Sequence, residues 1–267
     1  MKLKMYQIDA FTDQVFSGNP AAVCILESWL DDTTMQRIAA ENNLAETAFL
    51  VKHREGFAIR WFTPSIEVAL CGHATLASAF VLFNYYDVTT DKINFYSQSR
   101  GALSVEKGKD GLLTLDFPVD AIVEVQPQDT LNEAIGKVPI QTFKGKTDYL
   151  LIYESQQDIE DIAPNFHVLG KANVRGVIVS AKGIKVDFVS RFFAPGSGID
   201  EDPVTGSAHT TLTPYWSKQL GKTKLSAKQL SKRGGDLFCE DLGERIKITG
   251  KAVPYLIGEI EIQGSLP

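Results

Sequence analysis

An approximate internal repeat is the feature that most constrains how this chain can fold. The motif RWFTP at 60–64 is echoed by RFFAP at 191–195, and CGHA at 71–74 is echoed by TGSA at 205–208. A glycine-containing hairpin pattern at 101–117 returns at 234–249. Three matches in the same order and at nearly the same offset indicate two copies of one structural unit. We therefore predict two similar halves, each large enough to bury its own core.

Both halves show the same alternation of short strand patterns with a long helix. Alternating or β-branched residues predict strands over 5–10, 22–26, 47–51 and 58–62, and again over 149–153, 176–180 and 185–191. A glycine precedes each long helix, predicted at 73–85 and 207–220, and Gly221 ends the second one. Pro214 predicts a bend in that helix. Asp31 and Asp32 predict the start of a shorter helix over 33–41.

The helix predicted at 73–85 is apolar on nearly all of its faces, and such a helix belongs inside a protein. The fold class that follows is α+β, with two pseudo-symmetric halves. Each half is expected to be a curved, mostly antiparallel sheet wrapped round a central helix. We predict an N-terminal half at 1–120 and a C-terminal half at 121–267, with the chain returning to the N-terminal half near its end. The proline-bearing stretch 118–139 is the expected crossing.

Composition excludes several classes of protein. The chain has 267 residues, 44% of them hydrophobic, and a formal net charge of −6, which argues against disorder and against a nucleic-acid partner. Three scattered cysteines argue against a disulfide framework. A secretory signal and a membrane-spanning apolar stretch are not recognisable, so we expect a soluble cytoplasmic protein with no membrane partner.

The starts of the two predicted helices carry the candidate binding groups. If the halves are related by a pseudo-twofold axis, both helix N-termini point toward one cleft, where their backbone N–H groups and partial positive charges favour an anion. A small carboxylate is the expected substrate. His73 follows Gly72 at the start of the first helix, Ser207 follows Gly206 at the start of the second, and Asp202 precedes the second helix.

Glu46 is the third candidate, since it stands immediately before the apolar strand predicted at 47–51. Most glutamates are solvated loop residues. A carboxylate at the lip of an apolar element is different, because partial burial disfavours its charged form and so suits it to accept and return protons.

Five motifs taken together resemble the phenazine-biosynthesis PhzF-like isomerase family. They are FSGNPAAV at 16–23, NLAETAF at 43–49, RWFTP at 60–64, CGHATL at 71–76 and EDPVTGSA at 201–208. The resemblance extends over essentially the whole chain. It implies the diaminopimelate-epimerase-like fold, usually as a homodimer, and catalysis without a cofactor. No metal site is expected, because the four histidines show no paired ligand spacing.

The resemblance also implies roles for individual residues. Glu46 matches the family's general acid/base, which moves a proton between two carbons of a small amino-acid-like substrate. His73 and Asp202 match further catalytic positions. Gly72, Gly206 and Ser207 match positions that bind the substrate.

Two alternatives stay open. Racemases of the same fold use two facing cysteines, and here Cys71 occupies the first position while Thr205, whose hydroxyl is far less acidic than a thiol, occupies the second. We therefore expect Cys71 to be a packing residue, and we do not expect it to pair with His73, because positions i and i+2 do not normally face each other. The other alternative is a non-catalytic small-molecule binding protein on the same scaffold.

Overall fold

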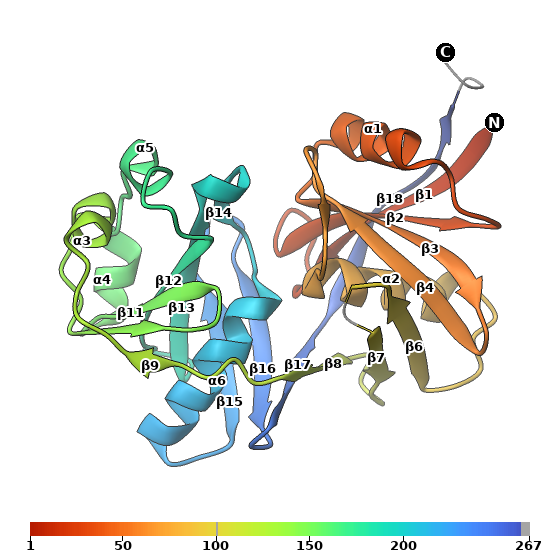
Figure 1. Ribbon diagram of the computed structural model, residues 1–267. Coiled ribbons are helices and arrows are strands. Elements are labelled where there is room, and N and C mark those ends of the chain that lie inside the picture. Colours follow the sequence, from red (N-terminus) through yellow and green to blue (C-terminus); the bar gives the residue numbers. More distant parts are fainter. Residues whose placement is uncertain (100, 263–267) are drawn as a thin grey trace. The chain divides into compact units, whose positions relative to one another are not determined.

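The computed structural model describes residues 1–99 and 101–262, which form two compact units (Figure 1). Unit 1 comprises Met1–Asp116 and the described part of Thr249–Pro267, and unit 2 comprises Phe117–Ile248. The first crossing therefore lies at 116/117, where the sequence analysis placed it at 120/121. The described residues from Thr249 to 262 belong to unit 1, because the last strand pairs with the first one.

Unit 1 is a curved sheet with one helix on each face. Its elements are β1 (Lys2–Ala10), β2 (Asn19–Leu26), α1 (Asp32–Asn42), β3 (Glu46–His53), β4 (Gly56–Phe62), β5 (Glu67–Val68), α2 (Gly72–Tyr85), β6 (Lys92–Ser97), β7 (Gly101–Lys107), β8 (Leu113–Pro118) and β18 (Ala252–Glu261). The strand order is β18-β1-β2-β3-β4-β6-β7-β8, with β5 also paired to β4. Every pair is antiparallel except β2 with β3 and β4 with β6.

Unit 2 repeats this topology. Its elements are β9 (Val123–Glu124), α3 (Asp129–Ile135), β10 (Gln141–Lys144), β11 (Asp148–Ile152), α4 (Gln156–Asp161), α5 (Phe166–Leu169), β12 (Gly176–Lys182), β13 (Phe188–Ala194), β14 (Ile199–Asp202), α6 (Gly206–Leu220), β15 (Lys224–Gln229), β16 (Gly235–Asp241) and β17 (Arg245–Gly250). The order β9-β10-β11-β12-β13-β15-β16 has its parallel pairs, β11 with β12 and β13 with β15, at the corresponding places.

A pair of arginine–glutamate forks shows that the repeat extends to side chains. Arg60 binds both carboxylate oxygens of Glu67 at 2.7 and 2.6 Å. Arg191, at the equivalent place in unit 2, binds both oxygens of Glu201 at 2.7 and 3.0 Å. Each fork ties the end of a strand to the short strand that leads into the long helix, and bidentate pairing fixes its orientation. The predicted duplication is confirmed at the level of topology and of individual contacts.

The long helices form as predicted. The residues of α2 from Gly72 to Ala79 are buried, and α2 packs against β1, β2 and β3. α6 packs against β15 and β16 and ends at Gly221, which adopts a left-handed conformation with φ 66°. Pro214 lies inside α6 without ending it. The described residues contain no helix long and apolar enough to cross a membrane.

Some predicted boundaries were wrong. The stretch 118–139 is not a bare crossing, because it holds β9 and the helix α3, whose Leu131, Ala134 and Ile135 join the core of unit 2. The strand predicted from Lys185 begins only at Phe188, where the chain first pairs with Lys182. Helix α1 agrees with prediction, and Asp31 caps it by accepting a hydrogen bond from the Thr34 N–H at 2.9 Å.

Candidate active site

Three elements of unit 1 place candidate side chains at the start of α2. Asn19 opens β2, and Glu46 opens β3 directly opposite Ala21. Parallel neighbours that begin in register bring their first residues to the same edge of a sheet. Cys71 caps α2 from an extended conformation, and His73 is the second residue of that helix. The side chains of these four residues meet at this edge.

Glu46 and His73 form the centre of the cluster. Glu46 Oε2 lies 3.1 Å from His73 Nε2, and the two side chains are 12% and 4% exposed. Oε2 is buried and receives no aligned hydrogen bond from the described residues, so the contact with His73 is electrostatic proximity without hydrogen-bond alignment. A buried carboxylate oxygen that lacks an aligned donor is energetically costly, and such groups concentrate where a protein binds or transfers something.

Asn19 fixes the state of the histidine. Its Nδ2 lies 3.1 Å from His73 Nδ1 within the buried core. An amide N–H can only donate, so Nδ1 accepts and the proton of the neutral ring sits on Nε2, facing Glu46. The histidine is therefore oriented to stabilise a negative charge on Glu46 or to share a proton with it.

The conformation of Gly18 determines where Asn19 lies. Gly18 has φ +66°, and a Cβ built on it would come within 2.2 Å of the Ala10 carbonyl oxygen. Only glycine combines this backbone conformation with such a close approach. The turn that precedes β2 therefore requires the glycine of the GNP motif.

The position of the Cys71 side chain relative to His73 differs from the sequence-based expectation. Its Sγ lies 3.5 Å from His73 Nδ1 and 3.9 Å from Nε2. The prediction that residues i and i+2 would not face each other was wrong, because Cys71 has φ −141° and ψ 114° and stands outside the helix to which that rule applies. Cys71 is only 5% exposed, so it contributes to packing and also contacts the imidazole.

The ligand-type atoms of Glu46, Cys71 and His73 all lie within 4.8 Å of one another. Spacing along the chain gave no indication of such a group, since the carboxylate comes from a strand that starts 25 residues before the cysteine (71 − 46 = 25). Within the described part of the chain, these three residues form the one group of His, Cys, Asp or Glu side chains that could hold a metal ion.

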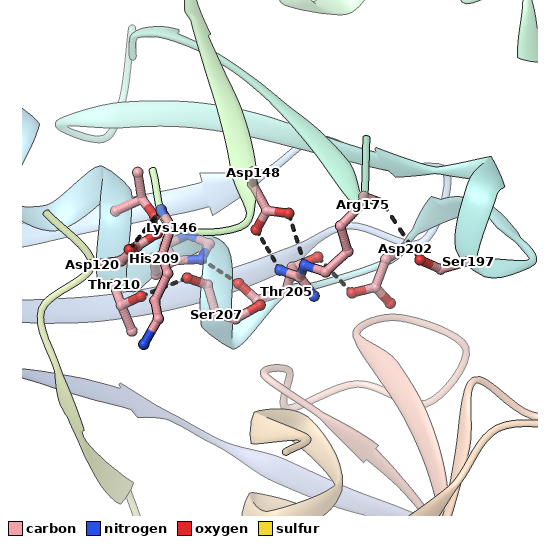
Figure 2. A network of polar contacts seen from close by, with 11 residues as sticks. Asp120, Lys146, Asp148, Arg175, Ser197, Asp202, Thr205, Ser207, His209 and Thr210 are labelled. Atoms are coloured by element: carbon pink, nitrogen blue, oxygen red, sulfur yellow. Dashed lines mark hydrogen bonds and ion pairs between the residues drawn. The ribbon is translucent and has the colours of Figure 1, made fainter. Parts of the chain in front are cut away.

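In unit 2, Asp202 sits at the end of β14 and is 9% exposed (Figure 2). The hydroxyl of Thr205, the N-cap residue of α6, donates to Asp202 Oδ2 at 2.5 Å. Gln229 is fully buried behind them. Its Oε1 accepts from the Thr205 N–H at 2.9 Å, and its Nε2 donates to the Asp202 carbonyl at 2.7 Å. Gln229 thus joins the end of β14 to the start of α6.

Figure 2 also shows His209 one turn into α6. Its Nδ1 lies 2.8 Å from the Thr205 carbonyl and must be the donor, while burial lowers the pKa of His209 to about 4. Thr75 makes the equivalent bond in unit 1, where its hydroxyl donates to the Cys71 carbonyl at 2.5 Å. The histidine thus provides a neutral donor that closes the first turn of the helix.

The structure divides the predicted site residues between the units. Glu46, Gly72 and His73 lie together in unit 1. Asp202, Gly206 and Ser207 lie together in unit 2, where Gly206 starts α6 and Ser207 is half-buried. Sequence reasoning missed the parts played by Asn19 and Gln229. Asn19 lay inside a quoted motif, but Gln229 carried no local signal, because only strand pairing brings it to Asp202.

The duplicated α+β architecture is the diaminopimelate-epimerase-like fold, and in unit 1 it carries a buried carboxylate–imidazole pair. The fold is shared with a hydroxyproline epimerase from Agrobacterium vitis, solved with bound trans-4-hydroxy-L-proline. That similarity has a TM-score of 0.61 at 11% identity, covers 97% of this chain and 92% of the other, and concerns the fold alone.

Within that class, residues 8–258 match the model of the phenazine biosynthesis-like protein family, and the chain belongs to this family. It is 51% identical over 263 residues to an uncharacterized isomerase from Pseudomonas aeruginosa, covering 98% of this chain and 100% of the relative. A crystal structure of a PhzF family protein from Enterococcus faecalis superimposes with a TM-score of 0.94 at 46% identity, covering 98% and 100%. The predicted family, fold class and isomerase class are confirmed.

Proposed function

We propose that this isomerase moves a proton between two carbons of a small carboxylate or amino-acid-like substrate, with Glu46 as the general acid/base and without a cofactor. The observation that carries the proposal is the buried Oε2 of Glu46, which faces His73 at 3.1 Å and receives no aligned hydrogen bond from the described residues. A carboxylate held in this way can accept a proton and return it.

In the proposed reaction, Glu46 removes a proton from a carbon next to an electron-withdrawing group of the substrate. The electron pair delocalises within the substrate, and Glu46 returns the proton at a second carbon. His73, whose Nε2 lies 3.1 Å from Oε2, stabilises the carboxylate electrostatically before and after the transfer. The reaction conserves all atoms and electrons of the substrate.

The backbone N–H groups at the start of α2 are proposed to hold the substrate's polar groups. The first N–H groups of a helix are not used inside the helix and carry partial positive charge, so they favour a carboxylate. Gly72 begins α2 beside His73, and the absence of a side chain at this position lets a ligand approach the backbone.

The family resemblance also assigns Asp202, Gly206 and Ser207 to the reaction, and these roles stay predictions, as do a shared cleft, a homodimer and a cytoplasmic location. Two contacts support the assignment of Asp202: the Thr205 hydroxyl donates to its carboxylate, and Gln229 Nε2 donates to its backbone carbonyl. A double variant tests it. If Glu46 and Asp202 act on the same bound substrate, the loss of exchange rate in the Glu46→Gln/Asp202→Asn double variant will be smaller than the product of the losses in the two single variants.

Solvent deuterium exchange tests the role of Glu46. A panel of cyclic and acyclic amino acids and carboxylates is incubated in D2O with enzyme, and mass spectrometry identifies substrates that gain one deuterium. Glu46→Gln should abolish exchange, whereas Glu55→Gln, which changes an exposed residue in the turn after β3, should retain it. Undiminished exchange in Glu46→Gln would show that Glu46 is not the base.

A thiol-based epimerase is the second candidate, and the 3.5 Å contact between Cys71 Sγ and His73 Nδ1 favours it. Thr205 stands at the corresponding place in unit 2, where its hydroxyl is engaged by Asp202 and would not replace a second thiol. Cys71→Ser separates the candidates. The carboxylate mechanism expects exchange to persist, whereas the thiol mechanism expects it to be lost.

A further inference from the structure

The side chains at the start of α2 carry the donor set of a thiophilic metal ion. Zn2+ prefers thiolate sulfur, imidazole nitrogen and carboxylate oxygen, usually with tetrahedral geometry. Zn–S and Zn–N bonds of about 2.3 and 2.0 Å at a tetrahedral angle place sulfur and nitrogen about 3.5 Å apart. Cys71 Sγ lies 3.9 Å from His73 Nε2, and Nε2 lies 3.1 Å from Glu46 Oε2. These two pairs thus stand near the spacing that one ion requires, and all three ligand atoms lie within 4.8 Å of one another.

A second observation points to a ligand at the same place. Glu46 is about nine-tenths buried, and its Oε2 receives no aligned hydrogen bond from the described residues although it faces His73. A buried anionic oxygen without an aligned donor is stabilised when a cation binds it. All three ligand atoms are mutually within 4.8 Å, so a small side-chain shift lets one ion bind all of them.

Asn19 supplies the support that a metal-bound histidine requires. Such a histidine normally donates its second ring N–H to an oxygen acceptor, which fixes the ring. The Asn19 amide already lies 3.1 Å from Nδ1. A half-turn of this amide would present its oxygen to an Nδ1 proton and leave Nε2 available to the ion.

We propose that Glu46, Cys71 and His73 bind one Zn2+ ion, or another thiophilic divalent cation, and that this binding inhibits the enzyme. On binding, the Cys71 S–H bond breaks, its proton passes to solvent, and the sulfur forms the metal bond without any change of oxidation state. Glu46 Oε2, once bound to the ion, can no longer accept a proton from a substrate carbon. The site is therefore a reversible block on the chemistry and not a cofactor site.

Cobalt spectroscopy tests this inference on the intact chain without any substrate. After treatment with a chelator and its removal, wild-type protein is titrated with Co2+. We expect one equivalent to produce a near-ultraviolet thiolate-to-cobalt band together with the visible bands of tetrahedral cobalt, and one equivalent of Zn2+ to displace both. A wild-type protein that gives no such band at one equivalent overturns the proposal, whatever the variants do.

Matched cysteine variants assign the band to its residue. Cys71→Ser should lose it, whereas Cys239→Ser should keep it, because Cys239 is buried within β16 of unit 2 and burial raises its thiol pKa to about 12. Asn19→Ala should weaken Zn2+ binding by roughly 10- to 100-fold, the usual effect of removing an outer partner of a metal ligand. A full-strength band in folded Cys71→Ser, checked by circular dichroism, would also overturn the assignment.

Failure of this proposal and failure of the proposed function can be told apart. The cobalt titration reports binding even if no substrate is ever found, and deuterium exchange in metal-free enzyme reports catalysis even if no metal binds. When both succeed, added Zn2+ should abolish exchange and a chelator should restore it. Exchange that continues undiminished in zinc-saturated enzyme would refute the inhibitory part.

Discussion

The side-chain amide of Asn19 lies 3.1 Å from Nδ1 of His73, and this contact decides which nitrogen of the ring faces Glu46 with a proton. Asn19 and His73 are 54 residues apart in sequence and meet because β2 begins beside the start of α2. The cluster is thus organised by a residue that has no acid/base chemistry of its own.

Replacing Asn19 should change proton transfer without preventing folding. In Asn19→Ala, Nδ1 loses its donor, and the ring can take the tautomer whose Nε2 presents a lone pair to the Glu46 carboxylate. We expect the rate of deuterium exchange to fall by about two orders of magnitude, the lower end of the range for a general acid/base contribution, because Asn19 acts through His73. The measurement is exchange rate against pH.

Asn19→Asp is the informative companion variant. A carboxylate at this position accepts from Nδ1–H and favours the doubly protonated ring, so the pH dependence of exchange should move to higher pH. A purely structural role for Asn19 predicts a lower rate at every pH with no displacement of the profile.

Removing Gln229 should destabilise the protein through the backbone groups it satisfies. Gln229→Ala leaves the buried Thr205 N–H and the Asp202 carbonyl without these partners. Each unsatisfied buried group costs about 1–3 kcal/mol, so we expect a loss of roughly 2–4 kcal/mol in the free energy of unfolding. Urea denaturation measures it. Gln157→Ala, which removes a hydrogen bond at an exposed site in α4, should cost less than about 0.5 kcal/mol.

His209 should make stability depend on pH. Its pKa is lowered from 6.5 to about 4 by burial, so the folded state resists protonation while the unfolded state accepts it. The contribution of neutral His209 to the free energy of unfolding is complete above pH 6.5 and is lost as the pH falls from 6.5 toward 4. A difference of 2.5 pKa units (6.5 − 4) corresponds to roughly 3 kcal/mol.

The variant His209→Asn isolates that contribution, because an asparagine amide can donate to the Thr205 carbonyl and does not titrate. Urea unfolding is measured for both proteins at pH 7.5 and pH 4.5. Wild-type stability should fall by about 2–3 kcal/mol more than that of the variant over this interval. Equal falls would show that His209 does not contribute as its burial implies.

Gly18→Ala should be much more harmful than a matched glycine replacement. Gly18 and Gly111 both have left-handed backbones, with φ +66° and +73°. An alanine Cβ meets nothing within 4 Å at Gly111 but lies 2.2 Å from the Ala10 carbonyl oxygen at Gly18. Gly111→Ala should therefore cost about 1–2 kcal/mol for its conformation alone, and Gly18→Ala should cost more. Similar unfolding free energies for the two variants would contradict the close approach.

Local sequence determined the parts of the structure whose forces act over a few residues. Three features depend on neighbouring residues: the apolar helix at 73–85, the cap at Asp31 and the glycine stop at Gly221. Each formed as predicted. The helices α3, α4 and α5 escaped prediction, because they are 7, 6 and 4 residues long and are stabilised by packing.

The sequence by itself determined the duplicated α+β fold, the isomerase family and the candidate Glu46, since motif and periodicity are written along the chain. Only the tertiary structure decided that Asn19 orients His73, that Gln229 supports Asp202 and that Cys71 contacts the imidazole. Strand order and register bring those atoms together from distant positions in the chain. The burial that results excludes water, so each polar contact is stronger and its loss costs more free energy.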